Sequence, residues 1–309
     1  MSASNANQGF LRQAQDGRRL SPNGCIGVVL TLLTTAAAHA AGPEITSDAP
    51  AEPPGVQRPL WELGLGVAGL RLPDYRGSDQ YHAYALPLPY VVYRGKWLRA
   101  DREGARALLL DANRVKVDVS VAASVPTRSR DNAAREGMPD LAATGEIGPN
   151  VNVTLFRATD RSMKLDLRLP VRAAVTFESS PRFIGATFSP NLNLDLINVA
   201  GGWNVGLLAG PLYGNRKYHA HFYGVDEQYA TATRPAYQAP GGYAGWQALA
   251  ATSRRFGNTW VGAFVRYDSL AGAVFADSPL VRSTHAVTAG VGISWVFARS
   301  SELVTTYED

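Results

Sequence analysis

The stretch from His285 to Phe297 (HAVTAGVGISWVF) constrains the fold of this chain more than any other segment. Its alternate positions are apolar: Val287, Ala289, Val291, Ile293, Trp295 and Phe297. Small or polar residues lie between them: Thr288, Gly290, Gly292 and Ser294. An apolar stripe toward lipid, small groups toward a lumen and aromatics at the membrane boundary are typical of a transmembrane β-strand. We therefore predict an outer-membrane barrel whose closing strand carries Trp295 and Phe297 as its assembly signal.

The amino-terminal residues have the pattern of an export signal. Arg12, Arg18 and Arg19 precede an uncharged apolar run at 25–38, which leads to a small-residue site ending at Ala40. This run is shorter than the ~20 residues that a membrane helix needs, so a cleaved signal is the better interpretation. The predicted divisions are a signal peptide at 1–40, a flexible periplasmic lead-in at 41–60, the barrel at 61–297 and a periplasmic tail at 298–309.

Charge and cysteine content exclude several functions. Cleavage after residue 40 removes Cys25, the only cysteine, so no disulfide or thiolate metal site is expected. The formal charge of the whole chain is +4, and residues 1–40 contribute three Arg and one Asp to it. The mature chain is therefore close to neutral, which argues against a nucleic-acid partner. No cofactor is expected.

Alternation of apolar and polar residues recurs along the rest of the chain and predicts an all-β fold. The clearest example runs from Met163 to Thr176. Twelve such segments are predicted, at about 61–71, 82–93, 96–102, 104–111, 115–124, 141–157, 162–176, 182–197, 203–213, 242–254, 258–268 and 284–297. The third and fourth are short enough to be one bent hairpin, and Pro87 and Pro89 weaken the second because each lacks a ladder donor. An even number fits a closed antiparallel barrel with both termini in the periplasm.

The connections and the aromatic residues favour the same architecture. Long and short connections mostly alternate, which predicts short periplasmic turns and long extracellular loops. Aromatic residues fall at both predicted ends of the strands, as the two girdles of a barrel would. A soluble all-β periplasmic protein is the alternative, but it gives no reason for tryptophans at alternate turns.

Charged residues on the alternating segments are predicted to line the lumen. These residues are Lys116, Asp118, Lys164, Asp166, Arg168 and Arg172. Facing lipid would cost about 2–4 kcal/mol for each Lys or Arg near the midplane, so they should point inward. They either pair across a filled lumen or line a narrow water path, and their mixed signs favour pairing.

Three short motifs allow catalytic or binding alternatives. Gly64, Gly66 and Gly69 spell GxGxxG, but they lie within a strand pattern and lack the turn and helix of a nucleotide site. Histidine 285 lies near Ser283 and Asp277, which would permit a hydrolase triad at the rim if their geometry allowed it. His219 and His221 would offer two imidazoles on one side of an extended loop, with no evident third metal ligand. We expect neither catalytic nor metal-binding residues.

Several separated motifs together resemble the MipA/OmpV family of outer-membrane proteins. They are PDYRGSD at 73–79, YALPLPYVVYRG at 84–95, the loop at 218–237, DSPLV at 277–281 and the terminal GISWVF. The resemblance covers about 61–297. It departs from the usual pattern at the C-terminus, where twelve residues follow Phe297.

The resemblance implies a non-enzymatic barrel that scaffolds or anchors peptidoglycan-remodelling enzymes at the cell outer membrane of a Gram-negative bacterium. The implied partners are a lytic transglycosylase and a penicillin-binding protein, together with membrane lipids or lipopolysaccharide and the outer-membrane assembly machinery. Two other functions remain open from the sequence: a narrow channel for small solutes and a surface adhesin or antigen.

Overall fold

The computed structural model describes residues 56–95, 98–101, 104–112 and 114–306. The predicted signal peptide and most of the predicted lead-in therefore lie outside the described residues. Side chains between positions 96 and 113 are likewise outside the description.

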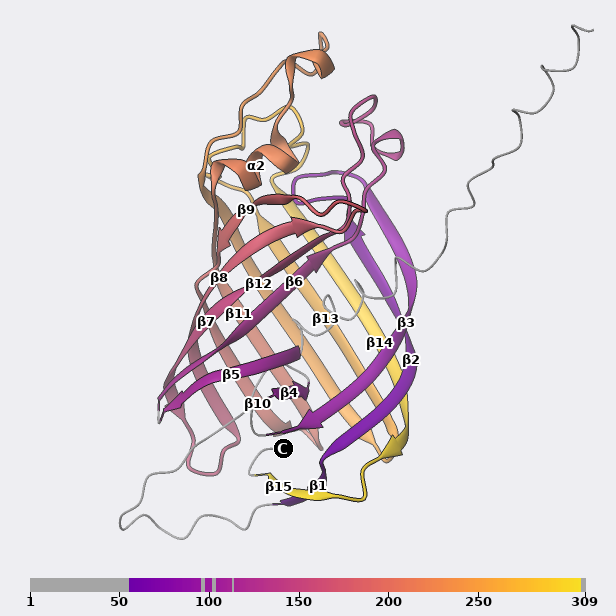
Figure 1. The fold of residues 1–309 in the computed structure, drawn as a ribbon, viewed down its shortest axis with the longest axis vertical. Coiled ribbons are helices and arrows are strands. Elements are labelled where there is room, and N and C mark those ends of the chain that lie inside the picture. Colours follow the sequence, from indigo (N-terminus) through magenta and orange to yellow (C-terminus); the bar gives the residue numbers. More distant parts are fainter. Residues whose placement is uncertain (1–55, 96–97, 102–103, 113, 307–309) are drawn as a thin grey trace, which may run out of the picture.

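One large antiparallel sheet of thirteen strands forms most of the described chain. Its strands are β2 (Trp61–Pro73), β3 (Tyr81–Arg94), β4 (Leu98–Asp101), β5 (Gly104–Ala112), β6 (Val115–Ser124), β7 (Thr144–Arg157), β8 (Met163–Thr176), β9 (Phe183–Phe188), β10 (Asn191–Val199), β11 (Trp203–Gly214), β12 (Gly242–Phe256), β13 (Thr259–Ser269) and β14 (His285–Arg299). The strands run tilted around a common long axis (Figure 1). The all-β antiparallel fold is thus confirmed.

The strands pair mainly with their neighbours in the sequence, and two further pairings join distant parts of the chain. Strand β14 pairs with β2, with Val291 opposite Gly69. Strand β10 pairs with β11 on one side and β8 on the other, while β9 pairs with β8 and, at Tyr213 and Gly214, with β11.

The predicted strand at 182–197 is observed as two strands. Strand β9 ends at Phe188 and β10 begins at Asn191, so Ser189 and Pro190 separate them. Pro190 has no backbone N–H to donate to a ladder, which explains why the pairing is interrupted there. The backbone of the third and fourth predicted segments forms separate antiparallel strands, β4 and β5.

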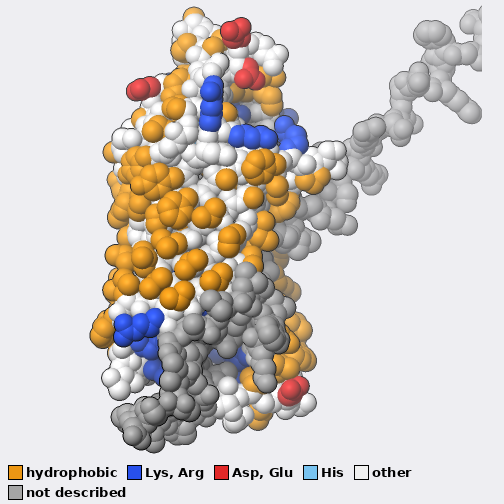
Figure 2. Space-filling model, turned by 60° about the vertical axis from the view of Figure 1, so that its left-hand side comes forward, with side chains coloured by type: hydrophobic (Ala, Val, Ile, Leu, Met, Phe, Trp, Pro, Cys, Tyr) orange, Lys and Arg blue, Asp and Glu red, His pale blue; other side chains and the backbone are white. Residues whose placement is uncertain are grey.

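Burial along the strands follows the alternation in the sequence. In β14, exposed and shielded residues alternate over most of the strand, with Val291 61% and Ile293 49% exposed and Ser294 1% exposed. Exposed apolar side chains form a broad band around the middle of the face in Figure 2, with Lys, Arg, Asp and Glu mostly above and below it. The strands therefore have an apolar outer face and a mainly polar inner face, which suits a lipid-exposed sheet.

Strand β3 explains how two prolines are accommodated. Pro87 and Pro89 lie opposite Val67 and Leu65 of β2. On the other edge of β3, only Tyr93 and Arg94 pair with β4. Within the described residues the edge from 81 to 92 has no strand partner there, so the missing N–H groups remove no hydrogen bond from a ladder.

The two ends of the sheet differ. Apart from the short connection between β4 and β5, short turns lie at one end, here called the turn end, and the long connections lie at the other, the loop end (Figure 1). The loop end includes the 3₁₀ helices η2 (Ser129–Asp131) and η3 (Glu227–Tyr229) and the helix α2 (Arg216–Tyr223). No helix in the described parts of the chain is long and apolar enough to cross a membrane.

A second, two-stranded sheet lies at the turn end (Figure 1). Strand β1 (Val56–Pro59) pairs antiparallel with β15 (Leu303–Thr306), and Gln57 Nε2 donates to Thr305 Oγ1 at 2.8 Å. These residues belong to the segments predicted as a flexible lead-in and a tail. Strand β14 also extends to Arg299, two residues beyond the predicted closing aromatic. We call this small sheet the terminal ribbon.

Candidate functional site

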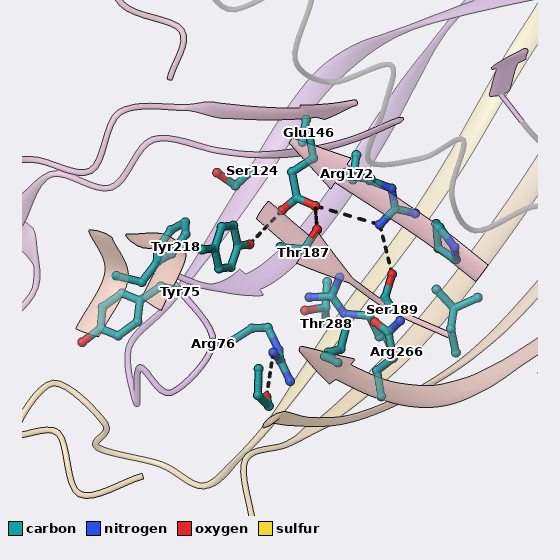
Figure 3. A pocket seen from close by; sticks show the side chains of 18 of the residues that line it. Tyr75, Arg76, Ser124, Glu146, Arg172, Thr187, Ser189, Tyr218, Arg266 and Thr288 are labelled. Carbon is teal, nitrogen blue, oxygen red and sulfur yellow. Dashed lines mark hydrogen bonds and ion pairs between the residues drawn. The ribbon is translucent and has the colours of Figure 1, made fainter. Parts of the chain in front are cut away.

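A cavity of about 320 Å³ lies inside the sheet toward the loop end. Its wall combines apolar side chains such as Leu70, Leu249 and Phe264 with several charged and hydroxyl side chains. Figure 3 shows Glu146, Arg172, Arg76 and other polar residues converging on this space. Mixed apolar walls with a few convergent polar groups are typical of ligand pockets.

Glu146 of β7 is the centre of one polar network in the cavity wall. Its Oε1 accepts a hydrogen bond from the hydroxyl of Tyr218 at 2.8 Å, and its Oε2 accepts one from Thr187 at 3.0 Å. Arg172 Nη1 lies 3.9 Å from the same Oε2 and also donates to Ser189 Oγ at 3.2 Å. Burial and then the Glu146 carboxylate raise the pKa of Tyr218 well above its usual value, so this hydroxyl keeps its proton. The network ties α2 to the sheet (Figure 3).

Asp268 of β13 is the centre of a second network. Its two carboxylate oxygens accept from Arg76 Nε and Arg266 Nε, each at 2.8 Å. Arg76 also donates to the carbonyl of Ala244 at 3.1 Å. Asp268 is only 1% exposed, whereas the side chains of Arg76 and Arg266 are 21% and 30% exposed. The two arginine side chains line the cavity, and the carboxylate that holds them is buried.

The six residues predicted to line the lumen all lie on inward positions of β6 and β8. Lys116, Asp118, Lys164 and Asp166 are at most 9% exposed. Asn150 and Asn152 donate to Asp118 at 3.1 and 2.9 Å, and Lys164 Nζ lies 2.7 Å from Asp166. Asp118, Arg168 and Arg172 reach the cavity wall. These contacts are made within one strand or between neighbouring strands, and pairing across a filled lumen stays a prediction.

The loops at the loop end pack into a unit that we call the cap. It comprises 74–80, 125–143, 215–241 and 270–284, and its apolar core includes Tyr75, Leu141, Tyr223, Phe275 and Leu280. The hydroxyl of Tyr75 donates to the carbonyl of Leu280 at 2.7 Å, and that of Tyr223 donates to the carbonyl of Arg76 at 2.9 Å. Burial raises the pKa of Tyr223 to about 12. The cap lies next to the cavity, since Tyr75, Tyr223 and Phe275 also line it.

Buried arginines hold the cap loops together through carbonyl groups. Arg234, 9% exposed, donates to the carbonyls of Ala134 and Glu136 at 3.1 and 2.8 Å. Arg135, 3% exposed, donates to the carbonyl of Phe222 at 3.2 Å. Burial lowers the pKa of Arg135. These bonds connect two loops that contain no strand of the large sheet.

Trp295 and Phe297, predicted as the assembly signal, lie on the outer face of β14. They are 60% and 59% exposed. Ala298 and Arg299 continue the pairing of β14 with Leu63 and Glu62 of β2. The two aromatics are therefore outward-facing residues near the turn end, followed by two more paired residues.

The structure does not bring together the other motif residues. His219 and His221 lie on α2 and not on an extended loop. Two residues along a helix are rotated by about 200° around its axis, so the two side chains leave the helix on nearly opposite sides. His219 is fully buried and its Nδ1 lies 2.7 Å from the carbonyl oxygen of Pro240, while burial lowers the pKa of His221 to about 4. Ser283 Oγ donates to the backbone carbonyl of His285 and not to its ring. Among the described residues no group of three or more His, Cys, Asp or Glu side chains could hold a metal.

The GxGxxG glycines lie within β2 and serve close strand packing. A Cβ at Gly66 would lie 1.8 Å from the carbonyl oxygen of Ile293 in β14. The glycine is therefore required by the approach of the neighbouring strand.

Sequence reasoning missed most residues of the two cavity networks, including both central carboxylates. Glu146, Arg266 and Asp268 lie on inward positions of β7 and β13, beside outward Ile147, Val265 and Tyr267, so alternation alone could have assigned them to the lumen. Arg76 comes from a loop and Tyr218 from α2, within a segment predicted as a loop, where no period predicted orientation.

The fold and these inward polar networks define an all-β protein with an apolar exterior and a polar interior. Residues 65–297 match the family described as MltA-interacting protein MipA, and the chain belongs to this family. Membership implies an outer-membrane β-barrel protein, in a family not known for enzymatic activity.

Two solved structures are similar to this chain at low sequence identity. A bacterial polysaccharide outer membrane secretin is 10% identical, with a TM-score of 0.38, over 77% of this chain and 99% of that one. The outer membrane phospholipase A from Escherichia coli is 13% identical, with a TM-score of 0.32, over 77% of this chain and 94% of that one. No curated protein matches the sequence.

Proposed function

We propose that the chain is a closed twelve-stranded antiparallel barrel in the outer membrane of a Gram-negative bacterium. Strands β9 and β10 together take one strand position of the barrel, because both lie between β8 and β11. The remaining eleven strands of the large sheet take the other eleven positions. The exposed apolar band would meet lipid, and the buried charges of β6 and β8 would lie in the lumen.

The turn end would face the periplasm. Short turns on that side and long loops outside are the usual asymmetry of such barrels. Strands β1 and β15 pair with each other, so this orientation would place both ends of the described chain in the periplasm, where a signal peptide is cleaved.

Within this barrel, the proposed function is to anchor a lytic transglycosylase at the outer membrane. The family description names an interaction with MltA. The observation that carries the proposal for this chain is the terminal ribbon. Within the described residues its two short strands pair only with each other, so each leaves an edge on which an extended segment could pair. A penicillin-binding protein would join through the same assembly. No catalytic step is assigned to the chain.

Capture of soluble MltA by the purified, folded barrel in detergent tests this function. Deletion of 300–309 removes β15 and should abolish capture while the heat-dependent shift in gel mobility of the barrel is retained. Replacement of 226–236 in the cap by a Gly-Ser linker is the matched control and should leave capture unchanged. Loss of capture with the cap variant alone would overturn the periplasmic anchor and favour an outward-facing role such as adhesion.

A further inference from the structure

The large sheet has a gap beside the cavity. Strand β3 is joined to β6 only through the short strands β4 and β5. Strand β4 pairs with β3 at Tyr93 and Arg94, and β5 pairs with β6 only from Val115 to Asp118. Within the described residues, the edges 81–92 of β3 and 119–124 of β6 therefore face each other without a strand between them.

The cavity reaches this gap. Every residue from Asp118 to Val125 lines the cavity, although successive residues of a strand point to opposite faces. On β8 alternate residues line the cavity, namely Arg168, Pro170 and Arg172, so the unbroken run on β6 indicates that the cavity also borders the free edge of this strand. We call this opening, bounded by the two free edges, the side mouth. It lies in the same strands whose outer faces carry the apolar band, on the loop-end half of the sheet.

The cavity wall offers positive charge to a ligand. Arg266 and Arg76 are 30% and 21% exposed, and the Arg172 side chain is 16% exposed. The guanidinium of Arg266 is held within the described residues only through Nε, by Asp268, so its two amino groups remain as donors. Thr288 lies opposite Arg266 in the ladder, is 6% exposed, and its Oγ1 has no partner among the described groups.

The acidic groups of the wall are already engaged. Asp74 is 8% exposed, accepts from Asn132 Nδ2 at 2.7 Å and lies 2.5 Å from His82 Nδ1, and Asp118 is 3% exposed and accepts from two asparagine side chains. Behind the wall, Asp268 is 1% exposed and is held between two arginines. Glu146 accepts from two hydroxyls beside Arg172. The accessible charge is thus mainly guanidinium, while Leu70, Leu249 and Phe264 give an apolar wall next to it.

We propose that the cavity binds an anionic amphiphile, with a carboxylate head at Arg266 and Thr288 and an apolar body that enters from the membrane through the side mouth. A guanidinium binds a carboxylate through two parallel hydrogen bonds, and the Thr288 hydroxyl supplies a third donor. This inference rests on the proposed membrane placement and not on the anchoring of an enzyme, so its test is independent of MltA capture.

Binding of decanoate to the folded barrel in micelles of a neutral detergent tests the head site. Decanoate should stabilise the protein against thermal unfolding, and decanol, which has no charge, should not. Arg266→Met should weaken decanoate binding about tenfold or more, and Arg266→Lys should restore part of it. Arg182→Met, at an exposed ion pair on the rim, is the control and should bind as the wild type does.

The side mouth is tested by two matched tryptophan substitutions. Val121→Trp places a large ring at the free edge of β6 and should slow decanoate association severalfold. Val171→Trp, on the 48% exposed outer face of β8 and away from the gap, should not. Equal binding of decanol and decanoate, or unchanged binding in Arg266→Met, overturns the head site. Equal association rates in the two tryptophan variants overturn entry through the side mouth.

Discussion

The ring of Tyr223, the last residue of α2, is stacked on that of Phe275 from the loop between β13 and β14, with centroids 3.7 Å apart and planes inclined by 11°. His219 meets the same Phe275 ring edge-on at 4.5 Å. Phe275 is fully buried, so one residue joins two loops that are distant in sequence. The cap is therefore a packed apolar unit with its own core and not a set of independent loops.

Phe275→Ala should loosen the cap without unfolding the sheet. Removal of a buried phenylalanine typically costs about 3–5 kcal/mol, and here both ring partners of Phe275, Tyr223 and His219, belong to the cap. Limited proteolysis of the folded protein should show faster cleavage within 215–241 in this variant. Val274→Ala, at the neighbouring 38% exposed position, is the control. Equal cleavage rates in the two variants would contradict a shared core.

Acid should weaken the cap through His221. Burial first, and then Arg135 and Arg182, lower its pKa from 6.5 to about 4, against the opposing effect of Glu178. Because an unfolded segment would take up the proton near pH 6.5, the stability of the packed cap should be constant above that pH, fall between about 6.5 and 4, and level off below.

Hydrogen exchange of 215–241, corrected for the intrinsic effect of pH, measures this change. His221→Gln should reduce the pH dependence, and some should persist because burial also lowers the pKa of His219. His285→Gln, on the exposed rim, should leave the wild-type profile. A profile unaffected by His221→Gln would show that other groups control the opening of the cap.

Glu62 should be more important to stability than its surface counterparts. Its side chain is 4% exposed and lies between Arg255, to which it is hydrogen-bonded, and Arg94, with Nη1 4.0 Å away. Glu62→Gln leaves two guanidinium groups under-neutralised, and breaking a buried pair costs about 3–5 kcal/mol. The free energy of unfolding of the barrel, measured with guanidinium chloride as denaturant, tests this. The exposed pair of Glu178 and Arg182 is the comparison, because Glu178→Gln should lower this free energy by at most about 1 kcal/mol.

Alternation predicted the strands because each one separates an apolar exterior from a polar interior, and this requirement acts on every second residue. It also placed Asp118, Lys164 and Asp166 inward. The same reasoning cannot reach contacts made outside the sheet. The pairing of Gln57 with Thr305 joins two short segments with no period, and the bond from Tyr218 to Glu146 depends on α2, which lies within a segment predicted as a loop. The gap between β3 and β6 depends on register and was not predictable from twelve segments of similar pattern.

Replacement of both Trp295 and Phe297 by Ala should impair assembly. Each ring is about 60% exposed on the outer face of β14. Removing one ring from its contact with lipid should cost about 2 kcal/mol of stability in the membrane. Because Ala298 and Arg299 still pair with β2, the matched tail deletion begins at residue 300. The yield of heat-modifiable barrel in the outer membrane should fall in the double variant and stay near normal in the deletion. The opposite result would assign the assembly signal to the tail.

A last prediction separates an anchor from a channel. The cap packs at the loop end next to the cavity, and the predicted lumen residues make internal contacts, such as Lys164 with Asp166 at 2.7 Å. The folded protein should therefore give no discrete conductance steps in a planar bilayer. Replacement of 226–236 by a Gly-Ser linker should not change this, because the cap core at Tyr223 and Phe275 remains. Regular steps in the wild type, with ion selectivity altered when Lys164, Arg168 and Arg172 are replaced by Glu, would instead favour a channel whose water path these three residues line.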